Sequence, residues 1–161
     1  MKLFLVMSDT HGHLSHAKMV LEQYPQIRSV IHLGDYLRDA AKLQNQFPET
    51  EFIMVPGNCD YAPNMPAERV LELEGNRILL THGHRYGVKS GMAGIESKAR
   101  EEGFQAVLFG HTHVPICKRT SFLLLNPGSL GYPRGFSGPT YGILEISGNQ
   151  MEARILKGSF I

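Results

Sequence analysis

Five short apolar segments of this 161-residue chain each lead into a glycine that lies beside Asp, Asn or His. Apolar runs of this length, bounded by turn residues, are typical of buried β-strands. In α/β proteins, ligands bind at the carboxyl ends of such strands. The segments are residues 2–7, 29–33, 51–55, 77–81 and 106–109, which lead into Ser8-Asp9-Thr10-His11-Gly12, Gly34-Asp35, Gly57-Asn58-Cys59-Asp60, His82-Gly83-His84 and Gly110-His111-Thr112-His113.

The segments between these strands predict an α/β fold with two sheets. Amphipathic stretches 13–24 and 38–47 are stopped by Pro25 and Pro48, so the first half is β-α-β-α-β, typical of a mainly parallel sheet. The second half predicts a hairpin at 68–81, a helix at 91–102 and further strands at 106–109, 115–119, 121–125, 141–146 and 150–156. We expect two packed β-sheets flanked by helices, a four-layer α-β-β-α sandwich with a metal site at the carboxyl ends of the strands.

The composition is that of a globular protein. Apolar residues make up 42% and charged residues 19%, and the length suits one domain over residues 1–161. The net charge of +1 gives no strong signal for nucleic acid or an anionic membrane. Two cysteines predict no disulfide framework, and no segment has the length of a signal peptide or membrane span. We therefore expect a cytoplasmic protein.

The polar residues at the strand ends form a set of metal donors. They offer two carboxylates, one amide oxygen and four imidazoles, a mixture that suits borderline divalent ions better than Ca²⁺. Seven donors exceed the three or four of one zinc site and fit two ions with a bridging carboxylate. The donors are Asp9, His11, Asp35, Asn58, His82, His111 and His113.

Each donor also has an ordinary structural interpretation. Asp9 and Asp35 could cap the following helices, and Asn58 could be a turn residue. Buried strand ends could hold the histidines without any ion. The recurrence of the pattern at five strand ends favours metal binding. For His84, contact with substrate and support of a ligand are equally favoured.

These motifs, in this order, resemble the calcineurin-like metallophosphoesterase superfamily, and in particular its small prokaryotic phosphodiesterase branch. The resemblance covers residues 1 to about 130 and includes Asn126-Pro127-Gly128-Ser129. It implies a first ion held by Asp9, His11, Asp35 and His113, and a second held by Asp35, Asn58, His82 and His111. It further implies a metal-bridging hydroxide that attacks phosphorus in line, with Asn58 and His84 as catalytic residues. Mn²⁺ is the expected ion, with Ni²⁺, Fe²⁺, Co²⁺ or Zn²⁺ as alternatives.

One position departs from many relatives, which have histidine where this chain has Cys59. A neutral thiol is a poor general acid, so the group that protonates the leaving oxygen is open. We expect a phosphodiesterase acting on a small phosphate ester, with a homodimer possible. The alternatives are a phosphomonoesterase, a non-catalytic scaffold like the trafficking-complex subunit of the same superfamily, and a DNA nuclease. The low net charge argues against the nuclease.

Overall fold

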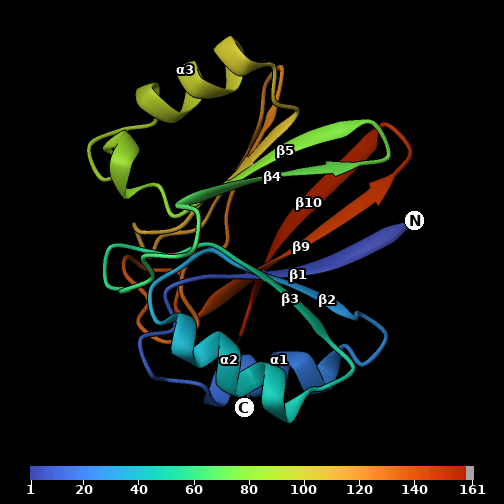
Figure 1. The fold of residues 1–161 in the computed structure, drawn as a ribbon, viewed down its shortest axis with the longest axis vertical. Coiled ribbons are helices and arrows are strands. Elements are labelled where there is room, and N and C mark those ends of the chain that lie inside the picture. Colours follow the sequence, from blue (N-terminus) through green and yellow to red (C-terminus); the bar gives the residue numbers. More distant parts are fainter. Residues whose placement is uncertain (159–161) are drawn as a thin grey trace.

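The computed structural model describes residues 1–158, and two five-stranded mixed sheets form its centre. In Figure 1 the two sheets face each other, with α1 and α2 outside one sheet and α3 outside the other. This is the four-layer sandwich that the sequence predicts. The carboxyl ends of the parallel strands gather at the left of the view, and the amino terminus lies at the opposite end.

The first sheet has the strand order β10-β9-β1-β2-β3. Its central strands β1, β2 and β3 are parallel, whereas β9 pairs antiparallel with β1 and β10 antiparallel with β9. Helices α1 and α2 are the crossover connections and bury their apolar faces against this sheet. The elements are β1 (Lys2–Met7), α1 (Ser15–Gln23), β2 (Ser29–His32), α2 (Leu37–Gln46), β3 (Glu51–Met54), β9 (Thr140–Ser147) and β10 (Gln150–Lys157).

The second sheet has the strand order β4-β5-β6-β8-β7. The predicted hairpin is its β4–β5 pair, and β5, β6 and β8 run parallel. Helix α3 covers its outer face, where Ile95 and Ala99 are buried. The elements are β4 (Glu68–Leu73), β5 (Asn76–Thr81), the 3-10 turn η1 (His84–Tyr86), α3 (Ala93–Glu102), β6 (Ala106–Leu108), β7 (Ile116–Arg119) and β8 (Leu123–Asn126).

Three apolar clusters hold the layers together. One lies between the sheets and contains Val6, Ile31, Leu80 and Leu108, all without exposed surface. The others lie beneath α1 and α2 and beneath α3. Burial of this apolar surface fixes the sheets face to face and so places the loops that follow their strands at one common edge.

Cys117 belongs to the strand predicted at residues 115–119, and the expectation from that position that it is a core residue is wrong. Cys117 is exposed, because β7 is the outermost strand of its sheet and pairs only with β8. Its Sγ donates a hydrogen bond to the carbonyl oxygen of Ala153 in β10. In the described part of the chain, no helix has both the length and the apolar character to cross a membrane.

Candidate metal centre

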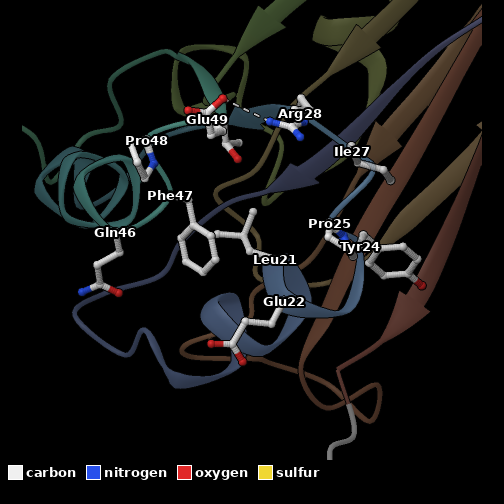
Figure 2. Close-up of a pocket in the computed structure, with 11 residues that line it drawn as sticks. Leu21, Glu22, Tyr24, Pro25, Ile27, Arg28, Gln46, Phe47, Pro48 and Glu49 are labelled. Carbon is white, nitrogen blue, oxygen red and sulfur yellow. Dashed lines mark hydrogen bonds and ion pairs between the residues drawn. The ribbon is translucent and has the colours of Figure 1, made fainter.

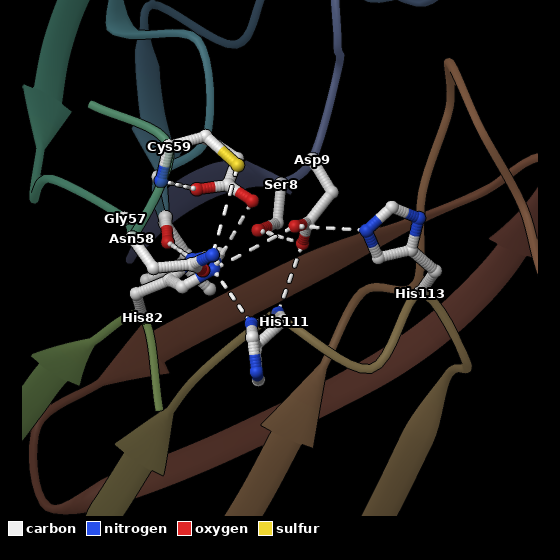
Figure 3. Close-up of polar contacts among 12 residues, drawn as sticks. Ser8, Asp9, Gly57, Asn58, Cys59, His82, His111 and His113 are labelled. Carbon is white, nitrogen blue, oxygen red and sulfur yellow. Dashed lines mark hydrogen bonds and ion pairs between the residues drawn. The ribbon is translucent and has the colours of Figure 1, made fainter. Parts of the chain in front are cut away.

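The loops after β1, β2, β5 and β6 bring six of the seven predicted donors together. They form two clusters, in each of which one ligand atom per residue lies within 4.8 Å of every other. Figure 3 shows how Asp9, His82, His111 and His113 approach one another from separate loops. The first cluster is Asp9, His11, Asp35 and His113, and the second is Asp35, His82 and His111.

The first cluster surrounds a carboxylate with imidazoles. The Oδ1 atom of Asp9 lies 3.2 Å from Nε2 of His113 and 3.8 Å from Nε2 of His11. That His11 nitrogen is also 3.4 Å from Oδ2 of Asp35. Both carboxylates are almost completely buried, so their charge needs a cation or a proton near it.

The second cluster shares Asp35 with the first. Its Oδ2 atom lies 3.5 Å from Nε2 of His82, and Nδ1 of His111 lies 3.2 Å from the same His82 nitrogen. One carboxylate oxygen therefore faces a ring nitrogen of each cluster. A shared carboxylate is the arrangement that two neighbouring divalent ions require.

Backbone carbonyls orient two of the imidazole rings. The Nδ1 atom of His82 donates to the carbonyl oxygen of Leu33 (2.7 Å), and Nδ1 of His113 donates to that of Tyr132 (2.6 Å). Each bond fixes the proton on Nδ1 and leaves Nε2 unprotonated in the neutral ring. These are the supporting contacts that metal-binding histidines have in proteins.

The carboxylates are oriented in the same manner. Oδ2 of Asp9 accepts hydrogen bonds from Oγ of Ser8 (2.5 Å) and the amide of His111 (3.0 Å). Oδ1 of Asp35 accepts one from the amide of Cys59 (2.9 Å). In each case the other oxygen is turned toward the imidazoles.

Two buried atoms of the first cluster have no hydrogen-bond partner within residues 1–158, namely Oδ1 of Asp9 and Nε2 of His11. A buried polar atom without a partner costs about 1–3 kcal/mol, so native proteins rarely leave one unexplained. Both atoms are good donors to a borderline divalent ion, and they face each other. The residues present therefore fit a metal ion.

The charges at this site shift several pKa values. Burial alone would raise the pKa of Asp9, but the nearby imidazoles of His11 and His113 and the charge of His82 hold it well below its usual range. Burial and the charge of His82 lower the pKa of His111 to about 4. At neutral pH Asp9 is therefore ionised and His111 neutral, which are the forms that bind metals.

His82 differs from His111. Burial acts to lower its pKa, yet the carboxylates of Asp35 and Asp9 raise it above the ordinary value. In the absence of an ion, its Nε2 therefore tends to carry a proton between the two carboxylates. A bound cation would take the place of this proton, so metal binding would release it.

Five of the predicted ligands have a backbone conformation that residues other than glycine rarely adopt. Such conformations with positive φ cost about 1–3 kcal/mol each and are concentrated at functional sites. They turn the side chains of neighbouring loop residues into one space. The φ values are 55° for Asp9, 46° for His11, 59° for Asp35, 73° for His111 and 60° for His113.

The glycines of the motifs allow the loops to touch. A Cβ atom on Gly57 would lie 2.1 Å from Oδ1 of Asp35, and one on Gly110 would lie 2.1 Å from Oγ of Ser8. Neither position accepts a side chain without displacing a group that orients a carboxylate.

Two predicted residues lie beside the clusters. Asn58 is exposed between Gly57 and Cys59, and its Nδ2 lies 3.6 Å from Sγ of Cys59. The ring of His84, in η1, is centred 5.5 Å from that of His82, and its buried Nδ1 has no partner among the described residues.

The capping alternative for Asp9 and Asp35 is wrong, because the residues preceding α1 and α2 are Leu14 and Tyr36.

Several supporting residues are absent from the sequence-based prediction of the site. Oγ of Ser129 donates to the carbonyl oxygen of Asp9 and accepts from the amide of Tyr132, each at 2.7 Å. The Ser129 hydroxyl thus contacts the loop that carries Asp9. It also holds Tyr132, whose carbonyl oxygen accepts the hydrogen bond from His113. Asp60 accepts hydrogen bonds from the amides of Leu37 and Gly57. The loop 126–129 is therefore packed against the site.

Other cavities lie away from the two clusters. One of about 290 Å³ opens between the ends of α1 and α2, where Leu21, Phe47 and Ile27 line it (Figure 2). None of the predicted site residues borders it.

The chain is similar to proteins whose family and fold are known. Residues 1–149 match the calcineurin-like phosphoesterase superfamily domain. The chain is 30% identical to the probable metallophosphoesterase YsnB of Bacillus subtilis over 93% of this chain and 88% of that one. It is 32% identical to the phosphodiesterase YfcE of Escherichia coli over 90% and 88% of the two chains. A predicted phosphoesterase of Streptococcus pneumoniae has the same fold, with a TM-score of 0.80 and 31% identity over 98% of this chain and 90% of that one.

Proposed function

This chain belongs to the calcineurin-like phosphoesterase superfamily, and we propose that it is a phosphodiesterase that works with two divalent metal ions. The observation that carries the proposal is the sharing of Asp35 by two clusters of ligand atoms. Each cluster has imidazole nitrogens directed at a carboxylate oxygen, and together they present more donors than one ion requires.

The proposed ligand sets follow the two clusters. Asp9, His11, Asp35 and His113 hold one ion, while Asp35, His82, His111 and the side-chain amide oxygen of Asn58 hold the other. When bound, such a pair of ions lowers the pKa of a water molecule and stabilises the attacking and leaving oxygens of an in-line displacement. Mn²⁺ is the first candidate among the borderline divalent ions that mixed nitrogen and oxygen donors suit.

His84 is the proposed contact to the phosphate. Burial and the positive charges of His82 and Arg85 lower its pKa, so the ring is neutral at pH 7. A neutral imidazole still has one N–H, which can donate to a phosphate oxygen as charge develops there. Its position beside His82 supports this role.

Cys59 does not supply the proton for the leaving group in this proposal. Burial and the charge of Asp35 raise the pKa of its thiol, so it is a weaker acid than an ordinary cysteine. Esters with good leaving groups are therefore the expected fast substrates, because they need no general acid. The similarity to YfcE, which is named a phosphodiesterase, favours diesters over monoesters.

The test is hydrolysis of bis-p-nitrophenyl phosphate and p-nitrophenyl phosphate by metal-stripped protein resupplied with Mn²⁺, Ni²⁺, Zn²⁺ or Mg²⁺. Metal-dependent cleavage of the diester, lost in Asp35→Asn, is expected. His13→Ala is the control, since this exposed histidine lies outside both clusters. Faster cleavage of the monoester would favour a phosphomonoesterase. Folded protein that cleaves neither ester with any ion would favour a non-catalytic scaffold.

A further inference from the structure

Two cavities lie near the metal centre, and each is lined by residues that contact one of the two clusters. A cavity of about 350 Å³ is lined by Tyr36 and Cys59, on the side of His11 and Asp35. A second, of about 580 Å³, is lined by Asn58 and His84, on the side of His82. Both volumes are in the range of sites for small organic ligands.

The segment 58–61 separates these cavities. Asp60 and Tyr61 line both of them, whereas Cys59 borders the smaller and Asn58 the larger. The backbone of this segment is held in place, because the two oxygens of Asp60 accept hydrogen bonds from the amides of Leu37 and Gly57. The side chain of Tyr61 is 95% exposed, so its ring forms an open aromatic edge between the cavities.

Each cavity also has one arginine. Arg38 lines the smaller cavity, and its guanidinium lies 4.3 Å from the centre of the Tyr36 ring, which in turn lies 4.8 Å from the His11 ring. Arg85 lines the larger cavity, next to His84. Within residues 1–158 neither arginine forms an ion pair with a carboxylate. Their N–H groups are therefore available to an anionic ligand.

We infer that the two cavities hold the two organic arms of a phosphodiester on either side of the cleaved phosphate, and that Arg38 and Arg85 select arms bearing further anionic groups. This inference rests on the proposed function and adds the substrate class. A monoester would fill one cavity only, whereas a diester with extended arms fills both. Exposed aromatic rings such as that of Tyr61 stack on planar bases, so a nucleotide-like arm fits the same edge.

The experiment compares three diesters with the Mn²⁺-loaded protein. The first is the dinucleotide thymidylyl-thymidine, and the others are the same dinucleotide with an added 5′-phosphate or an added 3′-phosphate. The wild-type kcat/KM is expected to be about fivefold higher for each charged dinucleotide, as for one exposed charge pair. Arg38→Ala should remove the preference for one charged dinucleotide, and Arg85→Ala the preference for the other.

Controls separate charge recognition from structural damage. Arg38→Lys and Arg85→Lys keep the charge and should retain part of the preference, seen mainly in KM. Arg100→Ala, on the exposed face of α3, should leave both preferences intact. Equal cleavage of all three dinucleotides by the wild type, cleavage of none of them by protein that cleaves bis-p-nitrophenyl phosphate, or preferences that persist in both alanine variants would overturn the inference while leaving the phosphodiesterase in place. Failure to cleave bis-p-nitrophenyl phosphate as well would overturn the proposed function itself.

Discussion

The ring of His82 donates a hydrogen bond from Nδ1 to the carbonyl oxygen of Leu33, 2.7 Å away, and this contact directs Nε2 toward Asp35. Because Leu33 lies directly after β2 and His82 directly after β5, the bond connects the two sheets at the metal centre.

The first prediction concerns His82. His82→Ala removes a nitrogen donor from the second cluster, so kcat/KM for the diester should fall by about 100-fold or more. Bound metal, measured by elemental analysis, should fall from two ions per chain toward one. His13→Ala should retain both ions. A His82→Ala protein with the wild-type metal content would contradict the assignment of this ligand.

The second prediction concerns Gly57. In Gly57→Ala the added Cβ would lie 2.1 Å from Oδ1 of Asp35, and the carboxylate must turn away. Metal affinity, measured by calorimetric titration, should fall by about 10- to 100-fold. Gly103→Ala is the matched control, since its Cβ meets no atom within 4 Å but its φ is +67°. It should cost about 1 kcal/mol of stability without changing metal affinity.

The third prediction concerns Ser129. Ser129→Ala removes one donor and one acceptor from a fully buried position, leaving the Asp9 carbonyl and the Tyr132 amide without their partner. The free energy of unfolding, measured with urea, should fall by about 1–3 kcal/mol. Exposed Ser121→Ala should change it by no more than about 0.5 kcal/mol. Equal stabilities of the two variants would show that the Ser129 hydroxyl does not join these loops.

The fourth prediction is a pH dependence that arises from His32. The amide of Gly34 donates to its Nδ1 (3.2 Å) and its Nε2 faces Oγ1 of Thr10 (3.1 Å), so the ring is neutral with its proton on Nε2. Burial lowers its pKa in the folded state, against the opposing charge of Asp9. A lowered pKa means that the unfolded chain binds the extra proton more readily. The contribution of His32 to the free energy of unfolding is therefore complete above about pH 6.5 and decreases below it.

Urea unfolding of the metal-free protein between pH 5 and 8 measures this effect. The slope should reach at most about 1.4 kcal/mol per pH unit below pH 6.5. His32→Asn keeps an acceptor for Gly34 but does not titrate, so the difference between the variant and the wild type should change with pH over that range. A constant difference would mean that His32 keeps its ordinary pKa.

The fifth prediction concerns Cys59. Burial and the charge of Asp35 raise the pKa of its thiol, so the reactive thiolate is scarce at pH 7. Cys59→Ser should keep a kcat/KM for bis-p-nitrophenyl phosphate close to that of the wild type. Alkylation of Cys59 by iodoacetamide should be slower than that of a model thiol at pH 7. Loss of activity in Cys59→Ser would indicate that the sulfur takes part in the reaction.

The sequence predicts the secondary structure well where local signals are strong. Pro25 and Pro48 follow the two amphipathic stretches, and the observed helices end two residues before them. The β4–β5 hairpin lies at the predicted residues 68–81 and turns at Glu74-Gly75. Local signals do not predict the strand order, because pairings such as that of Lys2 with Ile146 join residues far apart in the chain. The exposure of Cys117 follows from that order.

The site also combines features that the local sequence predicts with features that only the folded chain shows. Side chains of recognisable chemistry lie directly after apolar strands, so the six residues that form the two clusters could be named before their positions were known. The groups that orient them are often backbone atoms, such as the carbonyls of Leu33 and Tyr132. Every residue has a carbonyl, so residue type carries no signal for this role. Ser129 lies 120 positions from Asp9, and only the folded chain brings them together.

The positive φ values at five proposed ligands also restrict which ligand exchanges the protein can accept. Asn, Asp and His adopt this backbone conformation more often than other residues with side chains, and β-branched or bulky residues adopt it least. An engineer who wishes to change the metal preference would thus find Asp at His11 or His113 easier to accommodate than Glu or Cys, whatever the ion prefers. The backbone conformation therefore limits which residues can serve as ligands, independently of the preference of the metal ion.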